Sequence, residues 1–427
     1  MNKTQQTLAT GFTLFALFFG AGNLILPPYL GLQAGESWFF TAMGFAVSAV
    51  CIPILGIYAH ARLQGTMLDF ANKVSPLFSI VFCSLIYLIS ATIPSPRTAS
   101  VTHEMAVAPL FDIPSWVTSG IYFTLVFAVA VKRNSIIDIV GKYLTPVILT
   151  LLAVMIVLSF TLPLETAGTA LMSPGFSGGL LEGYQTFDAM GAVVVGAVII
   201  ISLSLRGEDS FESRKRLITR AGILAGSGLL ITYGGLIAAG ALFSGNTGAE
   251  ISRTELLNLI AQQTLGAPGR IFLSLLISLA CFTTAVGIVT GTADHIQGVL
   301  KGGKGTFTIS AALASLIGIL VGSLNVGFII DVAYPILLLI YPLIIVYIFL
   351  NSLPDFMTGK TVFRILTFVV VLFSIPDALK AILSPEQVPP WLDLMPLSEY
   401  QMGWLLPVVA TYVFLIIKKP ADKNQPV

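Results

Sequence analysis

Long runs of apolar residues alternate with short polar segments along the entire chain. A helix needs about 20 predominantly apolar residues to cross the hydrocarbon core of a bilayer, and stretches close to that length recur throughout. Each stretch predicts a membrane-spanning helix. The predicted spans are residues 7–31, 37–59, 76–99, 115–131, 136–162, 183–205, 217–243, 268–298, 306–324, 328–351, 361–383 and 402–418. The pattern therefore predicts an all-α integral membrane protein with about twelve transmembrane helices.

The composition supports this class and argues against several others. Of the 427 residues, 56% are hydrophobic and only 10% are charged, too few to cover the surface of a soluble domain of this size. The net charge of +1 gives no reason to expect nucleic acid as a partner. The 3 cysteines and 3 histidines are scattered, without the spacing of a metal site. We therefore expect no cofactor and no enzymatic activity.

The distribution of Lys and Arg predicts the orientation of the chain, because these residues collect on the cytoplasmic side of a membrane. With the N-terminus inside, all but four of the 22 lie in cytoplasmic segments. The four outside are Arg97, Arg253, Arg270 and Lys380. An even number of spans then places both termini in the cytoplasm.

One outer segment, "SRTELLNLIAQQTLG", predicts a short amphipathic helix. Ser252 precedes Glu255 by three residues, which is the spacing of a capping box at a helix N-terminus. Two interpretations stay open for this helix. It is either a lid over an extracellular vestibule or a helix that lies at the membrane interface.

The first span contains "LFALFFGAGNLILPPYLG", in which Gly20, Gly22 and Asn23 interrupt an apolar run. Glycine lowers the cost of leaving helical geometry, and an unwound stretch exposes carbonyls for a cation and N–H groups for a carboxylate. Asn23 would add a side-chain oxygen. The alternative is a close helix crossing through small residues, with Asn23 as an interhelical hydrogen bond.

The sixth span carries Asp188 in an apolar sequence, close to Gly191, where we expect this helix to break. A carboxylate inside a membrane is costly and nearly always faces a cavity, a partner or an ion. Interrupted first and sixth spans are what two inverted repeats of five helices each would provide. A hydrated carboxylate near the outer mouth is the structural alternative for Asp188.

The eighth span contains "ACFTTAVG", with the adjacent hydroxyls of Thr283 and Thr284. Both could turn toward one hard cation, which prefers oxygen ligands. Threonines in membrane helices also commonly bond a preceding carbonyl of their own helix. The sequence leaves both interpretations open.

Six stretches together resemble one known family. They are "FALFFGAGNLILPPYLG" at 15–31, "AGESW" at 34–38, "PRTAS" at 96–100, "EGYQTFDAMGA" at 182–192, "RLITRAG" at 216–222 and "LACFTTAVG" at 279–287. The family is that of the bacterial branched-chain amino acid:cation symporters, the BrnQ-type carriers. The resemblance runs from the first span to the eighth in the family's order, and with the predicted topology it covers essentially the whole chain.

The resemblance implies a secondary carrier of the inner membrane that imports leucine, isoleucine and valine. Sodium would be the coupling ion, with the proton as the alternative. The implied fold is leucine-transporter-like: a five-plus-five inverted repeat over about 7–162 and 183–351, followed by two additional helices over about 361–418. A carrier of the same fold for another neutral amino acid or amine is the nearest rival. A channel or a membrane enzyme is disfavoured, because neither ring-like polar repeats nor clustered acid, base or metal groups occur.

The resemblance also assigns site residues. By the resemblance to the wider leucine-transporter-like fold, Gly20, Ala21, Gly22 and Asn23 would occupy the unwound stretch. Backbone N–H groups of Ala21 and Gly22 would bind the substrate carboxylate, and Asn23 matches a position that ligates a second sodium in some members of that fold. This chain differs from those members by carrying Asp188. Three roles are open for Asp188: contact with the substrate ammonium, binding of a cation, or transfer of a proton.

A common sodium site of the fold would lie between the first and eighth spans. Its ligands would be the carbonyls of Ala16 and Phe19, together with Ala280 and the hydroxyls of Thr283 and Thr284.

The aliphatic side chain would enter an apolar pocket near Phe18, Phe19 and Phe187. Tyr87 is a further candidate to contact the substrate carboxylate, although a tyrosine placed for packing or at the membrane interface explains it as well. Arg97 and Glu104 predict either an outer ion pair near the vestibule or a solvated surface pair.

Overall fold

The computed structural model describes residues 3–132, 137–162, 168, 175–204, 210–245, 251–383, 387–389, 392 and 395–418. Within these ranges the regular structure is entirely helical. The α-helices are α1 Lys3–Phe18, α2 Ala21–Ala34, α3 Trp38–Ala46, α4 Ile52–Leu63, α5 Pro76–Thr92, α6 Pro94–Thr102, α7 Ser115–Ala130, α8 Thr145–Ser159, α9 Gly175–Tyr184, α10 Asp188–Ser204, α11 Phe211–Ala241, α12 Arg253–Leu265, α13 Gly269–Val299, α14 Lys304–Val321, α15 Val326–Ser352, α16 Lys360–Ile382 and α17 Leu405–Ile417. The all-α class is confirmed.

Among the described residues, each predicted apolar stretch is largely helical. In the described part of the chain, 8 helical stretches are long and apolar enough to cross a membrane, or 9 if the bent pair α9 and α10 is one span. The shorter apolar helices α7 and α17 add to these. The protein is thus an integral membrane protein, and the exact number of crossings stays a prediction.

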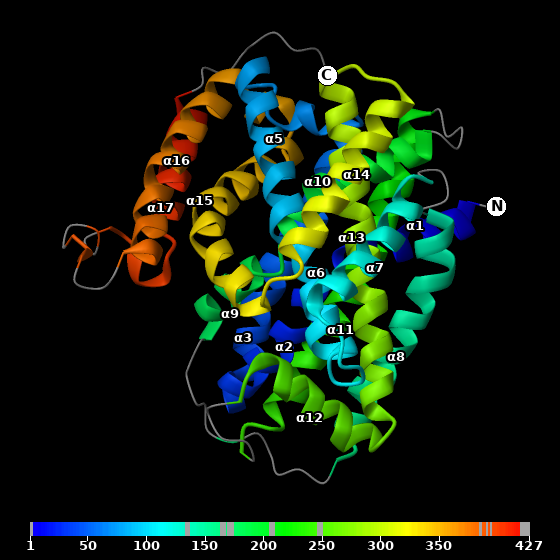
Figure 1. Cartoon of the computed structure of the whole chain (residues 1–427). Coiled ribbons are helices and arrows are strands. Elements are labelled where there is room, and N and C mark those ends of the chain that lie inside the picture. Colours follow the sequence, from blue (N-terminus) through cyan, green and yellow to red (C-terminus); the bar gives the residue numbers. More distant parts are fainter. Residues whose placement is uncertain are drawn as a thin grey trace.

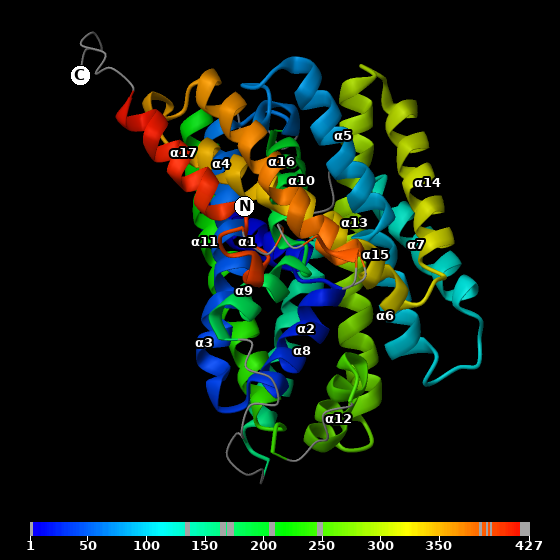
Figure 2. The ribbon, with the colours of Figure 1, turned by 90° about the vertical axis from the view of Figure 1, so that its left-hand side faces the viewer.

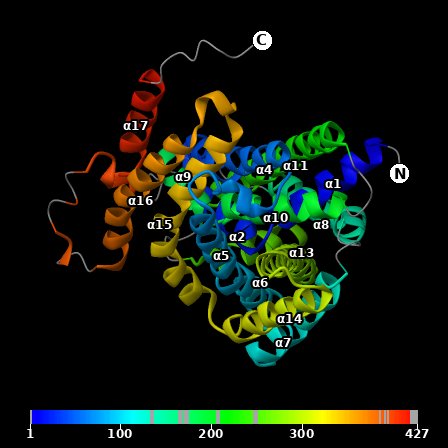
Figure 3. The same ribbon diagram turned by 90° about the horizontal axis from the view of Figure 1, so that it is seen from above.

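The helices are packed around a central group formed by α2, α10 and α13 (Figure 3). The pair α16 and α17 lies on one flank of this group, and α7 and α14 lie together on another (Figures 1 and 3). Helix α12 lies across the lower end of the molecule in both side views (Figures 1 and 2). Within this arrangement, most of the described side chains of α2 and α10 are buried.

Glycines let two pairs of helices pack backbone to backbone. A Cβ atom at Gly31 of α2 would lie 1.9 Å from the carbonyl oxygen of Ile237 on α11, and one at Gly240 of α11 would lie 1.9 Å from that of Pro28 on α2. Close approach through small residues is how membrane helices associate, since lipid provides little hydrophobic driving force between them. Helices α3 and α9 meet in the same way through Gly44 and Gly179.

We expect Gly240→Leu to destabilise the protein, because the side chain would enter the backbone of α2 and force the two helices apart. The melting temperature of the purified protein should fall by at least about 5 °C. Gly234→Leu is the matched control, since the space beside Gly234 on the same helix is open. Equal melting temperatures for the two variants would contradict the close α2–α11 contact.

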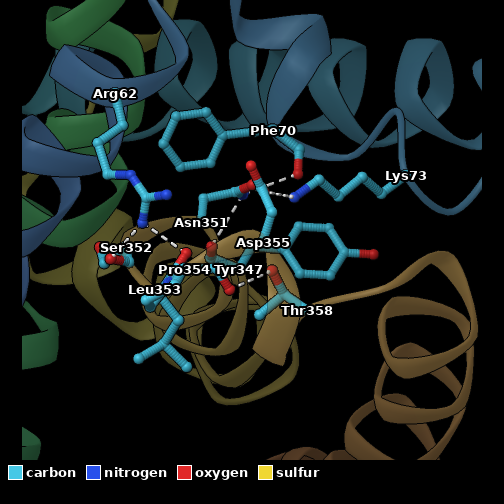
Figure 4. Close-up of polar contacts among 10 residues, drawn as sticks. All are labelled: Arg62, Phe70, Lys73, Tyr347, Asn351, Ser352, Leu353, Pro354, Asp355 and Thr358. Atoms are coloured by element: carbon cyan, nitrogen blue, oxygen red, sulfur yellow. Dashed lines mark hydrogen bonds and ion pairs between the residues drawn. The ribbon is translucent and has the colours of Figure 1, made fainter. Parts of the chain in front are cut away.

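Polar side chains tie the end of α15 to neighbouring elements (Figure 4). Arg62 of α4 donates from Nη1 to the carbonyl oxygens of Ser352 (2.7 Å) and Leu353 (2.5 Å). Asn351 donates from Nδ2 to the Phe70 carbonyl oxygen at 2.9 Å. A cation at the C-terminal carbonyls of a helix satisfies their acceptors and complements the helix dipole. These bonds hold three elements together at one end of the molecule: α4, α15 and the segment that precedes α5.

The predicted amphipathic helix is confirmed as α12, with its capping box. Ser252 Oγ accepts from the Glu255 N–H at 3.2 Å, and Glu255 Oε2 accepts from the Ser252 N–H at 2.9 Å. Hydrogen bonds to the Glu255 carboxyl from the side chain and the backbone N–H of Ser252 hold the pKa of this carboxyl below its usual value. The inner face of α12 is buried, including Leu256 and Ile260.

Candidate functional site

The first predicted span is broken, as expected from its glycines. Helix α1 ends at Phe18 and α2 begins at Ala21, so Phe19 and Gly20 form the break. Gly20 has an extended backbone and provides no side-chain cap to α2. The N–H groups of the first turn of α2 therefore receive no cap from the residue that precedes the helix. The unwound stretch is shorter than predicted, because Ala21, Gly22 and Asn23 already belong to this first turn.

The sixth predicted span is broken as well, but not at Gly191. Helix α9 ends at Tyr184 and α10 begins at Asp188, with a bend of 41° between them. Phe187 in the break has a φ of +63°, a left-handed conformation uncommon for a bulky residue. The prediction that Gly191 breaks the helix is wrong, because its N–H bonds the Phe187 carbonyl oxygen at 2.7 Å. Gly191 lies beside the Phe18 ring, and a Cβ atom there would be in ordinary contact with it at 3.6 Å.

A buried polar cluster joins the two broken helices. Asn23 donates from Nδ2 to both oxygens of Asp188, at 2.9 and 2.8 Å, and its Nδ2 also contacts the Tyr233 hydroxyl. Tyr233 of α11 donates to Asp188 Oδ2 at 2.9 Å. The exposed fractions of the three residues are only 1–2%. The Asp188 carboxylate thus has two hydrogen-bond donors, which offset part of the cost of burying it.

Asn23 therefore makes an interhelical hydrogen bond, and it lies next to an interrupted helix. The sequence offered the helix break and the interhelical bond as alternatives for the first span, and the structure contains both. Tyr233 was not predicted. It stands in a glycine-rich apolar run, and no feature of that run distinguishes a tyrosine that packs from one that bonds a carboxylate.

A small cavity lies where the two breaks meet. Its volume is about 30 Å³ for the centres of water-sized molecules, which is space for about two ordered waters. Asn23, Asp188 and Arg97 contribute its charged and amide groups. The remaining lining residues are Leu17, Phe18, Gly20, Ser90, Pro94, Thr98, Thr186, Phe187, Met190, Gly191, Val194, Val195, Thr284 and Ile288.

Two residues assigned to the substrate pocket lie elsewhere. Tyr87 lines a second cavity, where its ring stacks on His295 at 4.5 Å between centroids, so its assignment to the substrate site is corrected. Tyr87 lies on α5, before the junction with α6 at Ile93, whereas the residues that reach the first cavity from α6 follow that junction. The Phe19 ring stacks on Phe15 and on Tyr233 instead of lining the cavity.

Arg97 is not a surface residue, and neither interpretation of it is correct. Arg97 lies on α6, which runs to Thr102, beyond the predicted end of the third span at residue 99, and only 3% of its surface is exposed. It donates from Nη2 to the Gln185 carbonyl oxygen at 3.0 Å, and its guanidinium lies 4.9 Å from the centre of the Phe187 ring. Glu104 instead accepts from the backbone N–H of Val326.

The oxygens of the predicted sodium site gather between α1 and α13. Thr283 Oγ1 lies 2.7 Å from the Ala16 carbonyl oxygen and 2.9 Å from that of Ala280, while Thr284 Oγ1 lies 3.4 Å from the Ala16 oxygen. Thr283 thus bonds a carbonyl of its own helix and also one of α1. The Phe19 carbonyl follows the end of α1, within the break itself.

Arg253 attaches α12 to the helices that carry the breaks. It donates to Glu182 Oε1 and to Gln185 Oε1, each at 3.1 Å, and lies over the Tyr29 ring of α2. Both Arg253 and Glu182 are about three-quarters buried, since their side chains are 25% and 23% exposed. This contact with both broken helices favours the lid interpretation of α12.

We expect Arg253→Gln to loosen α12 without unfolding the protein. A partly exposed ion pair contributes up to about 1 kcal/mol, so amide hydrogen exchange within α12 should become about two- to fivefold faster. Hydrogen-exchange mass spectrometry of residues 253–265 measures this. Arg270→Gln, which removes an exposed arginine at the start of α13, should leave that exchange unchanged. The attachment would be refuted by identical α12 exchange in wild type and Arg253→Gln.

A helical membrane protein with two interrupted helices around a small cavity that holds a buried carboxylate has the architecture of a secondary transporter. The chain belongs to the family described as branched-chain amino acid transport protein, whose model matches residues 3–421. This confirms the family resemblance found in the sequence.

Two relatives match along nearly their whole length. The branched-chain amino acid transport system 2 carrier protein of Pseudomonas aeruginosa is 35% identical, over 97% of this chain and 96% of its own. The branched-chain amino acid permease BrnQ of Escherichia coli K12 is 31% identical, over 99% of this chain and 98% of its own. The relatives are carriers and permeases, which confirms a transporter and not an enzyme.

A solved structure is similar in fold. It is a sodium-coupled sialic acid symporter in a substrate-bound, outward-open state, with a TM-score of 0.61, 12% identity, and coverage of 99% of this chain and 91% of that chain. The likeness agrees with the leucine-transporter-like fold implied by the family.

Proposed function

We propose that the protein imports leucine, isoleucine and valine by symport with sodium, through alternating access. The observation that carries this proposal is the buried cavity at the meeting point of two helix breaks, lined by a carboxylate and by apolar side chains. Membership in the branched-chain amino acid transport family supports the substrate class. A carrier for another neutral amino acid or amine would use the same architecture.

The substrate's charged ends meet the two breaks. Asp188 is the counter-charge of the ammonium, and the uncapped N–H groups of Ala21 and Gly22 bind the carboxylate. The aliphatic side chain packs near Phe18 and Phe187. Its burial contributes about 25 cal/mol per Å², and one methylene changes affinity by only about 1–3 kcal/mol, so the three substrates share the site. The small cavity enlarges when the surrounding helices separate.

Sodium occupies the oxygens between α1 and α13, namely those of Ala16, Phe19, Ala280, Thr283 and Thr284. The convergence of four of these groups supports this assignment. The ion and the substrate both bind beside the first helix break, so each favours the other's binding by about 1–3 kcal/mol. If the proton is the coupling ion instead, Asp188 is the group in the cavity that can carry it.

The transport cycle rests on a five-plus-five inverted repeat, about 7–162 and 183–351, with the helices of about 361–418 outside it. In this proposal both termini face the cytoplasm and the protein lies in the inner membrane. Helix α12 then covers the outer side of the cavity. The bias of Lys and Arg toward one side supports this orientation.

A ligand panel tests the substrate class. Leucine, isoleucine and valine should each raise the melting temperature of the purified protein in sodium buffer, with dissociation constants within about 100-fold of one another. Isoamylamine and lysine should bind far more weakly, since one lacks the carboxylate and the other brings a charge into the apolar pocket. Stabilisation by a different amino acid or by the amine, but not by the three, would replace this substrate class.

A further inference from the structure

We propose that Arg97 is a substrate-binding residue. Its guanidinium and the uncapped N-terminus of α2 together form the site for the substrate carboxylate, opposite Asp188. This inference rests on the proposed function, because it assigns to a zwitterionic amino acid the cavity described above. It adds a charged group to a carboxylate site otherwise built from backbone N–H groups.

The first argument is the state of the arginine itself. Arg97 is 97% buried, yet its described side-chain hydrogen bond goes to a neutral acceptor, the Gln185 carbonyl oxygen. Its Nε has no hydrogen-bond partner in the described part of the chain, and none of the ion pairs found there includes Arg97. A buried cation is costly unless an anion compensates it. An anion that enters the cavity would provide this compensation.

The second argument is the position of the guanidinium against α2. A Cβ atom at Gly22 would lie 2.6 Å from Arg97 Nη2, so the guanidinium packs directly on the first turn of this 14-residue helix. A helix N-terminus carries a partial positive charge and repels a neighbouring cation. Two positive groups side by side, both facing a cavity, form a site for an anion such as a carboxylate.

The third argument is the separation of opposite charges in one cavity. Arg97 and Asp188 both line it, but they do not pair with each other, because the Asp188 oxygens accept from Asn23 and Tyr233. An α-amino acid carries the complementary pair of charges. It can place its ammonium beside Asp188 and its carboxylate beside Arg97, and it compensates both at once. An amine or a carboxylic acid compensates only one of them.

Leucinamide separates the two charges experimentally, since it keeps the ammonium and the side chain of leucine but lacks the carboxylate. We would titrate leucine and leucinamide against wild type and Arg97→Gln, using thermal stabilisation of purified protein. Wild type should bind leucine at least about 100-fold more tightly than leucinamide. Arg97→Gln should lower the affinity for leucine at least about 30-fold and keep the affinity for leucinamide within about threefold of wild type. The preference for leucine over leucinamide is then largely lost.

A purely structural role for Arg97 predicts a different result, namely that leucine and leucinamide weaken by the same factor. That result would overturn the assignment, as would unchanged leucine binding. If wild type binds no leucine, the proposed function falls together with this inference. If wild type binds leucine but the variant loses affinity for leucine and leucinamide by the same factor, only the role of Arg97 is reassigned.

Arg97→Lys keeps the test decisive if the glutamine variant does not fold. Lysine retains the positive charge but lacks the planar guanidinium that can donate two parallel hydrogen bonds. The affinity for leucine should therefore fall about tenfold, while that for leucinamide does not change. Equal weakening of both ligands would again overturn the assignment. Arg270→Gln is the control, because it removes an exposed arginine far from the cavity lining and should change neither ligand.

Discussion

Asp188→Asn is expected to abolish concentrative leucine uptake while the protein stays folded. The asparagine has the same shape and keeps an oxygen to accept from Asn23 or Tyr233, but the counter-charge for the ammonium is lost. Removing one partner of a buried charge pair costs about 2–5 kcal/mol, so the initial rate at low leucine concentration should fall at least about 30-fold. Uptake of radiolabelled leucine into proteoliposomes measures this rate.

Asp377→Asn is the matched control for this prediction. Asp377 is also a buried carboxylate, and it accepts from the backbone N–H of Gly403, but it lies on α16 away from the cavity. The initial rate of leucine uptake by Asp377→Asn should stay within about threefold of wild type. Normal uptake by correctly inserted Asp188→Asn would exclude Asp188 from both substrate and proton binding.

The double variant Thr283→Ala/Thr284→Ala is expected to weaken the dependence of transport on sodium. Both hydroxyls lie beside the Ala16 carbonyl of α1, and their removal takes two oxygens from the proposed site. The sodium concentration that gives half-maximal leucine uptake should rise at least about tenfold, because each lost ion–dipole contact contributes on the order of 1 kcal/mol. Uptake rates over a sodium titration in proteoliposomes provide the measurement.

Thr290→Ala/Thr292→Ala controls for the loss of two hydroxyls from the same helix. Thr290 and Thr292 are buried on α13, and Thr292 bonds the carbonyl of Ile288 in its own helix. This control should keep the sodium dependence of wild type. An unchanged half-saturation in Thr283→Ala/Thr284→Ala would remove these hydroxyls from the cation site.

The sequence predicted well those features that depend on local chemistry. Apolar stretches of sufficient length gave the helices, because a backbone in lipid must satisfy its hydrogen bonds within the segment. Gly20 marked the first break, and the capping-box spacing at Ser252 marked the start of α12. Asp188 was found because a carboxylate in an apolar span is rare.

The errors concern features that depend on tertiary contacts. The sequence favours a break at Gly191, but the break lies at residues 185–187, and the Gly191 N–H makes its hydrogen bond to the Phe187 carbonyl oxygen. The sequence places Arg97 among the outer charges, since it lies near the predicted outer end of the third span at residue 99. The structure continues the helix and turns Arg97 toward the two breaks. Only the packing of α6 against α2 and α13 reveals that position.

The most direct test of the account is leucine accumulation in proteoliposomes under one imposed gradient at a time. With an inward sodium gradient and equal pH on both sides, we predict that radiolabelled leucine accumulates above its external concentration. It should not accumulate under a proton gradient without sodium. Accumulation driven by the proton gradient alone, or no accumulation under either gradient, would contradict sodium-coupled transport of branched-chain amino acids.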